Sequence, residues 1–228
     1  MLEFLISFLI MAGAAQGSVY GPGDTVPDAV VRAQGADSFF TVQEISDELF
    51  DYIRGKSYKE DCTVPRSELR YITVLHKDIG GRTIVGEMIL NKAIASDVLE
   101  IMKELYANSY PIERMLLVDR YGASDEESMR DNNSSSFNYR TISGTSKVSK
   151  HGLGMAVDIN PLYNPYHKFL PSGKEIIEPA TGAAYLDRSK DFPYKITRGD
   201  LCWRLFTARG FTWGGGWANR KDYQHFEK

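Results

Sequence analysis

Apolar residues along the chain follow the periods of strands and of helices in turn. The stretch "ELRYITVLHKDIGGRTIVGEMIL" (68–90) holds two runs rich in β-branched and aromatic residues on either side of Gly80-Gly81, which predicts two strands joined by a turn. The next twenty residues (91–110) predict an amphipathic helix. Its apolar face is formed by Ile94, Val98, Ile101 and Leu105.

An earlier helix is expected at 41–55. Thr41 and Glu44 are spaced as a capping box, an apolar stripe follows, and Gly55 is placed as a C-terminal stop. The preceding segment (18–40) is rich in Gly, Pro, Asp and Ser, which is typical of a linker or a loosely attached lead-in.

The second half of the chain mixes shorter elements. The pattern predicts a strand at 112–122, a polar surface loop at 123–136 with one helical turn as the alternative, and a strand ended by Pro161. A loop-rich stretch at 163–195 follows, and then a helix at 196–210 with Leu201 and Leu205 inward. Two final strands around a glycine turn are expected at 211–228. Strands and helices show no regular βαβ alternation. This favours an α+β domain with a small mixed or antiparallel sheet flanked by helices.

The N-terminal residues "MLEFLISFLIMAGAAQGS" resemble a secretory signal, because a short apolar run precedes small residues. Glu3 and the absence of Lys or Arg at the front depart from that pattern, and a packed N-terminal helix or an uncleaved anchor are the alternatives. The run is too short for a full membrane span, so no stable span is expected after processing. We therefore expect a signal peptide or anchor at 1–17, a lead-in linker and helix at 18–65 and the main domain at 66–228.

Composition excludes some partners. The formal net charge is −3 and no block of five like charges occurs, so neither nucleic acid nor an anionic membrane surface is an expected partner. Cys62 and Cys202 show no CxxC pattern. In an exported protein they can form one disulfide, and two independent buried thiols are the equal alternative.

The candidate chemistry lies around two of the four histidines. In "SKHGLGMAVDIN" the carboxylate of Asp158 follows His151 by seven residues and lies inside an apolar run, where a charge is costly unless it is paired or binds a cation. In "DYQHFE" the second histidine, His225, follows Asp222 by three residues. Two histidines and one carboxylate match the composition of a catalytic zinc site, with Asp222 left as a general base.

Each of these patterns is weak alone, and chance spacing or a surface histidine explains any one of them. His76 on a predicted strand is expected to be structural, and His167 to be a solvated loop residue, with a place along a substrate groove as the alternative. A serine or cysteine hydrolase is disfavoured, because no G-x-S-x-G motif occurs and neither cysteine has a neighbouring histidine.

"SKHGLGMAVD" matches the SxHxxGxAxD signature of the zinc D-Ala-D-Ala carboxypeptidase family, and "GFTWGGGWANRKDYQHFEK" resembles the C-terminal block of its endolysin branch. This family includes vancomycin-resistance dipeptidases and carboxypeptidases and the L-alanyl-D-glutamate endopeptidases of phage endolysins. The resemblance covers roughly residues 66–228. It implies the hedgehog/DD-peptidase-like zinc peptidase fold and a metallopeptidase that cleaves peptidoglycan stem peptides.

The resemblance also implies roles for individual residues. His151, Asp158 and His225 look like Zn²⁺ ligands, and Asp222 like the catalytic carboxylate. Arg140 in "FNYR" resembles the arginine that approaches the substrate carbonyl or carboxylate. Ser149 matches the signature serine, which contacts substrate or orients the loop.

One departure from the family is visible at Gly216, because endolysin-type relatives usually have "WGGDW" where this chain has "WGGGW". Trp213 and Trp217 flank these glycines and are candidates for a groove wall, with core packing as the default for Trp213. We expect a monomeric enzyme that is secreted or associated with the cell envelope. A D-Ala-D-Ala carboxypeptidase is favoured, an L-alanyl-D-glutamate endopeptidase is the alternative, and a non-catalytic zinc-containing protein that binds cell-wall peptides is the alternative from another class.

Overall fold

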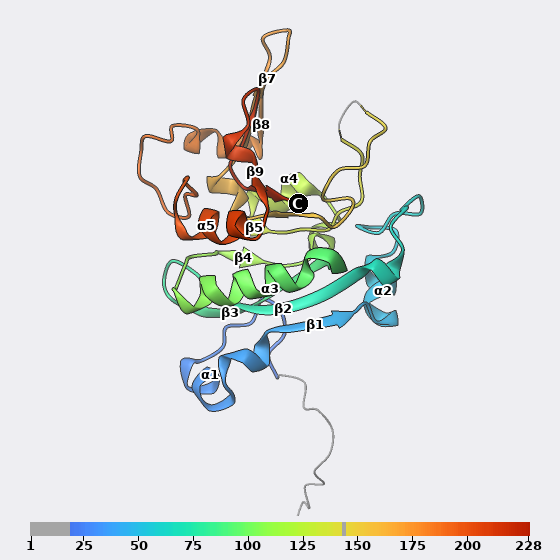
Figure 1. Ribbon diagram of the computed structural model, residues 1–228, viewed down its shortest axis with the longest axis vertical. Helices are drawn as coiled ribbons and strands as arrows, with labels where there is room; N and C mark the ends of the chain where they lie inside the picture. Colours follow the sequence, from blue (N-terminus) through green and yellow to red (C-terminus); the bar gives the residue numbers. More distant parts are fainter. Residues whose placement is uncertain (1–18, 143–144) are drawn as a thin grey trace, which may run out of the picture.

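The computed structural model describes residues 19–142 and 145–228 and has mixed α and β structure with small antiparallel sheets (Figure 1). The α-helices are α1 (Asp28–Gln34), α2 (Asp47–Ile53), α3 (Lys92–Ala107), α4 (Asp125–Arg130) and α5 (Leu201–Ala208). The strands are β1 (Thr41–Glu44), β2 (Leu69–Lys77), β3 (Thr83–Asn91), β4 (Arg114–Met115), β5 (Asn133–Ser134), β6 (Ala156–Asp158), β7 (Tyr166–Phe169), β8 (Glu175–Glu178), β9 (Thr212–Trp213), β10 (Lys221–Asp222) and β11 (His225–Glu227). The predicted α+β class is confirmed.

The β2–β3 hairpin and α3 form the centre of the main core, as the sequence predicts. The strands pair antiparallel from Leu69 opposite Asn91 to Lys77 opposite Thr83, and Gly81 in the turn has φ +78°, which glycine adopts without strain. Helix α3 begins after Asn91, whose side chain accepts a hydrogen bond from the Ala93 N–H. The helix lies across this sheet (Figure 1), and all four residues of its predicted apolar face are buried.

The segment predicted as a loose lead-in is instead packed. It contains α1 and a short 3-10 helix, and Val26, Val31, Phe39 and Phe40 are buried in the main core. The Gly, Pro and Asp residues that suggested a linker form the turns between these pieces, and the apolar residues between them reach the sheet.

The helix predicted from Thr41 begins later, at Asp47. Residues Thr41–Glu44 form β1, which pairs antiparallel with β2, so Glu44 is a strand residue and not part of a capping box. Ser46 is the actual N-cap, and its side chain accepts a hydrogen bond from the Leu49 N–H at 3.2 Å. Pairing with an existing sheet edge outweighs the local capping pattern.

Two small sheets in the C-terminal half carry the candidate chemistry. In the first, β11 is the central strand between β6 and β9. In the second, β7 is central between β10 and β8. The β7–β8 hairpin, which projects from the body (Figure 1), lies in the stretch that the sequence predicted as loops.

Helix α5 covers the first of these sheets from the core side. Its buried residues are Cys202 and Phe206, whereas Leu201 and Leu205 are only partly buried. The Phe206 ring stacks on Phe226 of β11 with centroids 4.3 Å apart. Because Phe226 faces this core, its neighbours His225 and Glu227 on the strand face the other way.

Both cysteines are free thiols. Cys202 is buried in the main core, and Cys62 packs against a separate cluster of apolar residues. Within the described part of the chain, no helix is both long and apolar enough to cross a membrane. The signal or anchor expected at 1–17 lies outside the described residues.

Candidate functional site

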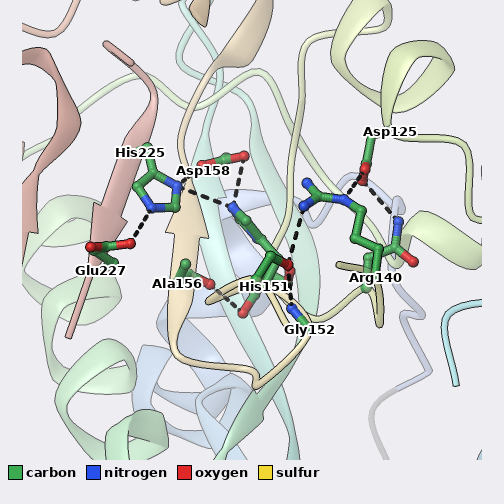
Figure 2. A network of polar contacts seen from close by, with 11 residues as sticks. Asp125, Arg140, His151, Gly152, Ala156, Asp158, His225 and Glu227 are labelled. Carbon is green, nitrogen blue, oxygen red and sulfur yellow. Dashed lines mark hydrogen bonds and ion pairs between the residues drawn. The ribbon is translucent and has the colours of Figure 1, made fainter. Parts of the chain in front are cut away.

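The structure brings together the three residues that the sequence suggested as metal ligands. Within the described residues, one ligand atom each of His151, Asp158 and His225 lies within 4.8 Å of the others. The Nε2 atom of His151 is 3.2 Å from one Asp158 carboxylate oxygen, and Nδ1 of His225 is 3.0 Å from the other (Figure 2). The two imidazole nitrogens are 3.1 Å apart.

Strand pairing places two of these side chains together. Asp158 on β6 and His225 on β11 are direct cross-strand partners, so their side chains leave the same face of the sheet. Val157 and Phe226, the pair beside them, are fully buried in the core on the opposite face. This alternation explains how a carboxylate occupies an apolar run.

A tight turn delivers His151 to the same place, and two glycines allow it. A Cβ atom at Gly152 would lie 2.9 Å from the Arg140 carbonyl oxygen. A Cβ atom at Gly154, where φ is +68°, would lie 2.7 Å from the Asn91 nitrogen. Other backbone segments therefore pass very close to the turn that follows His151, and only glycine leaves room for them.

Hydrogen bonds outside the cluster determine which nitrogen of each imidazole faces inward. Nδ1 of His151 is 2.7 Å from the Ser136 carbonyl oxygen, which can only accept, so this nitrogen carries the proton. Nε2 of His225 is 3.1 Å from the Glu227 carboxylate and donates to it. Figure 2 shows Glu227 on the far side of His225 from Asp158. In the neutral imidazoles, lone pairs on His151 Nε2 and His225 Nδ1 therefore point toward Asp158.

The electrostatics of the cluster match this geometry. Burial alone would raise the pKa of Asp158, but the charges and hydrogen bonds of His151 and His225 hold it well below its usual range. Burial alone would lower the pKa of His225, but hydrogen bonds to Asp158 and Glu227 raise it to about 10. Without a metal, a proton on His225 thus occupies the place that a cation would take.

This raised pKa predicts how the metal-free protein responds to pH. Because the folded pKa of His225 lies above the unfolded value of about 6.5, its protonation stabilises the fold fully below pH 6.5. That stabilisation is lost as the pH rises through about 10. We expect the melting temperature of the chelator-treated protein to fall between pH 7 and pH 10, by an amount equivalent to at most about 4 kcal/mol.

Thermal unfolding at the two pH values measures this fall, and His225→Gln is the control because it removes the titrating group. The fall should be clearly smaller in that variant. An identical fall in both proteins would show that His225 is not the responsible group.

Glu227 was missed by the sequence reasoning, although a signal for it existed. It lies two residues after His225 on the same strand, and residues so spaced share a face. Carboxylates that accept the outer proton of a metal-binding imidazole fix its tautomer and orientation. Glu227 has this relation to His225.

We expect Glu227→Ala to weaken metal affinity about 10- to 100-fold, the usual cost of losing such a partner. Glu227→Gln retains an acceptor for the Nε2 proton and should lose less. Competition against a chromogenic chelator measures both affinities. Equal affinity in Glu227→Ala and the parent protein would contradict the role.

Asp222 lies beside the cluster but is not one of its converging ligands. It lies on β10 opposite Tyr166 of β7. A Cβ atom at Gly214 would lie 2.7 Å from the Cβ atom of Asp222, so only glycine fits at position 214. Its Oδ1 atom is buried and has no hydrogen-bond partner among residues 19–142 and 145–228. The pKa of Asp222 is raised to about 7, chiefly by burial. The charges of Asp158 and Glu178 also raise this pKa, whereas those of His225 and Arg140 lower it. A carboxylate with this pKa can exchange a proton near neutral pH.

Arg140 and Ser149 form a second group next to His151. The Arg140 Nε–H donates to Asp125, and one of its Nη groups donates to the Ser149 hydroxyl at 3.2 Å (Figure 2). The same hydroxyl accepts the Gly152 N–H at 3.0 Å. Ser149 thereby connects Arg140 to the turn that carries His151.

Asp125 is a further residue that the sequence did not reveal, because it lies in a polar stretch fifteen residues before its partner. The pKa of Arg140 is raised, since Asp125, and less strongly Asp158 and Glu178, stabilise its charge against the opposing effect of burial.

The other histidines lie apart from the cluster. His76 is buried on β2 with Nδ1 bonded to the Ile112 carbonyl oxygen at 2.7 Å, which agrees with a structural role. His167 on β7 pairs with Glu175 at 2.8 Å.

Comparison with known proteins gave one match. Residues 143–228 match the family model described as D-alanyl-D-alanine carboxypeptidase. No match was found among curated proteins or among solved structures. The matched segment contains His151, Asp158, His225 and Asp222, and the first three of these converge in space. The C-terminal segment 143–228, which holds the candidate metal site, is thus similar to the D-alanyl-D-alanine carboxypeptidase family of peptidases.

Proposed function

We propose that the protein is a zinc-dependent peptidase that hydrolyses the stem peptides of peptidoglycan, with D-Ala-D-Ala carboxypeptidase activity. One observation carries the proposal: the convergence of His151 Nε2, Asp158 and His225 Nδ1 within the segment that matches the family. The family description supplies the type of bond. The same resemblance supports a hedgehog/DD-peptidase-like zinc peptidase fold and a location outside the cytoplasm.

The donor set fits a divalent metal. Two neutral imidazole nitrogens 3.1 Å apart repel each other unless a proton or a cation lies between them. Two histidines and one carboxylate are a composition found in catalytic zinc sites, in which a fourth position remains for water or substrate. A divalent ion bound there would polarise the scissile carbonyl and make a water molecule acidic enough to attack it near neutral pH.

The chain's own residues supply the proton transfers. Asp222, with a pKa of about 7 and a carboxylate oxygen without a partner, is suited to accept a proton from the attacking water. The same carboxyl group then returns the proton to the leaving amine as the peptide bond breaks. This feature favours catalysis over a protein that only binds wall peptides.

Arg140 is suited to hold an oxygen of the substrate. Its guanidinium is anchored by Asp125 and Ser149, so its position next to the His151 turn is constrained before substrate arrives. A planar guanidinium matches the oxygens of a carboxylate or a developing oxyanion. Ser149 contributes by orienting Arg140 and the turn.

Incubation of the zinc-loaded protein with purified muropeptides, followed by mass analysis, tests the proposal. Loss of a single terminal alanine is the expected result, and chelation should abolish it. Release of the stem without its first alanine would identify an L-alanyl-D-glutamate endopeptidase. Binding of the peptides without any cleavage would identify a non-catalytic protein and overturn the proposal.

A further inference from the structure

All three tryptophans of the chain line one hollow next to the candidate metal site. Trp203 from α5, Trp213 from β9 and Trp217 after the glycine turn enclose it together with Phe211 and Arg198, and its volume is about 270 Å³. Trp213 is held by a hydrogen bond from its Nε1 to the Tyr223 carbonyl oxygen at 2.9 Å. Trp203 and Trp217 are only half-buried and leave part of their ring surface available.

This aromatic pocket adjoins the site through shared residues. The Trp217 ring is 5.5 Å from the His225 ring, centroid to centroid. The glycine turn that leads to Trp217 packs directly against Asp222. The pocket therefore borders the candidate metal site on the side of His225 and Asp222.

Arg198 gives the pocket a positive charge, and a second arginine, Arg220, lies against the outer wall formed by Trp217. The Arg198 guanidinium lies over Trp203 at 5.6 Å, and that of Arg220 lies over Trp217 at 4.2 Å. In the part of the chain that the structure describes, no carboxylate forms an ion pair with either arginine.

Gly216 leaves the Arg198 guanidinium open to a ligand. A Cβ atom at this position would lie 3.4 Å from an Arg198 Nη atom, with no other atom nearby. A carboxylate side chain fits here without disturbing the backbone and would neutralise Arg198. An acidic residue at position 216 would therefore compete with a ligand carboxylate for the Arg198 guanidinium.

We propose that the aromatic pocket is a substrate subsite that binds a carboxylate of the peptide through Arg198, with the adjoining aliphatic part packed on Trp203 and Trp217. The inference rests on the proposed peptidase function and adds to it the anchoring group. A guanidinium on an aromatic wall recognises a carboxylate bidentately. Stem peptides offer two sources of this group, the C-terminal carboxylate and the free α-carboxylate of D-isoglutamate.

Four pentapeptides distinguish the sources: each combines a free or amidated C-terminus with D-isoglutamate or D-isoglutamine. Their binding is measured by tryptophan fluorescence on the zinc-loaded protein carrying Asp222→Asn, which slows turnover enough for binding to be followed. Arg198→Gln and Gly216→Asp should each weaken binding about 10-fold, the usual worth of a charge-assisted hydrogen bond. The loss should disappear with the peptide that lacks the recognised carboxylate. Arg32→Gln, an exposed arginine on α1, is the control and should bind normally.

Unchanged binding of all four peptides by both pocket variants would overturn the subsite. Weakened binding that is the same for charged and amidated peptides would also overturn it, because it indicates a structural role for Arg198. The readout does not depend on cleavage, so failure of the subsite and failure of the peptidase function are separate outcomes. With the active protein, Arg198→Gln should raise KM and leave kcat unchanged.

Discussion

Replacing His151 or His225 with alanine is expected to abolish peptidase activity and to lower zinc affinity by more than ~100-fold. Each substitution removes one of the three converging candidate ligands, a larger change than loss of a residue that only orients one of them. Zinc content after gel filtration and turnover of a D-Ala-D-Ala peptide measure the two effects. Both should fall together.

His167→Ala is the matched control, because this histidine also pairs with a carboxylate, Glu175 on the β7–β8 hairpin, but is not part of the cluster. It should retain zinc and activity. Full zinc binding by His225→Ala would show that His225 is not a ligand. Circular dichroism separates loss of metal from loss of fold.

Asp222→Asn should reduce kcat about 10²- to 10⁴-fold while the protein keeps its zinc. The amide has nearly the same shape but cannot accept the proton of the attacking water, and general base catalysis is worth about this much. Asn is preferred to Ala because Asp222 packs against the glycine turn. Single-turnover kinetics and zinc analysis of the same preparation give both numbers.

In the active protein, kcat/KM should fall on the acid side as Asp222 becomes protonated. The pKa of Asp222 in the metal-free protein is about 7, and a nearby cation stabilises the carboxylate, so the acid limb is expected below pH 7. Equal loss of zinc and turnover in Asp222→Asn would make Asp222 a ligand, which contradicts the role proposed here.

Local patterns were sufficient where an element is stabilised by its own neighbours. The alternating strands around Gly80-Gly81 and the periodic face of α3 predicted the central hairpin and helix correctly. The same patterns failed at Thr41–Glu44, where the capping box is local but the decisive partner, β2, lies about thirty residues later. Short segments are assigned by such distant pairings, and their sequence does not show them.

The candidate site, too, was predictable from the sequence only in part. The sequence by itself determined the types of residue: two histidines, and a carboxylate inside an apolar run, where an unpaired charge is costly. Only the tertiary structure decided that His225 on β11 faces Asp158 on β6, although the two residues are 67 positions apart. It also decided that Nδ1 of His225 and Nε2 of His151 point into the cluster. It also decided which groups hold these side chains, Glu227 and Ser136, and that the three tryptophans surround one pocket. The physical reason is that the direction of a hydrogen bond depends on which groups meet after folding, and residue type alone leaves that choice open.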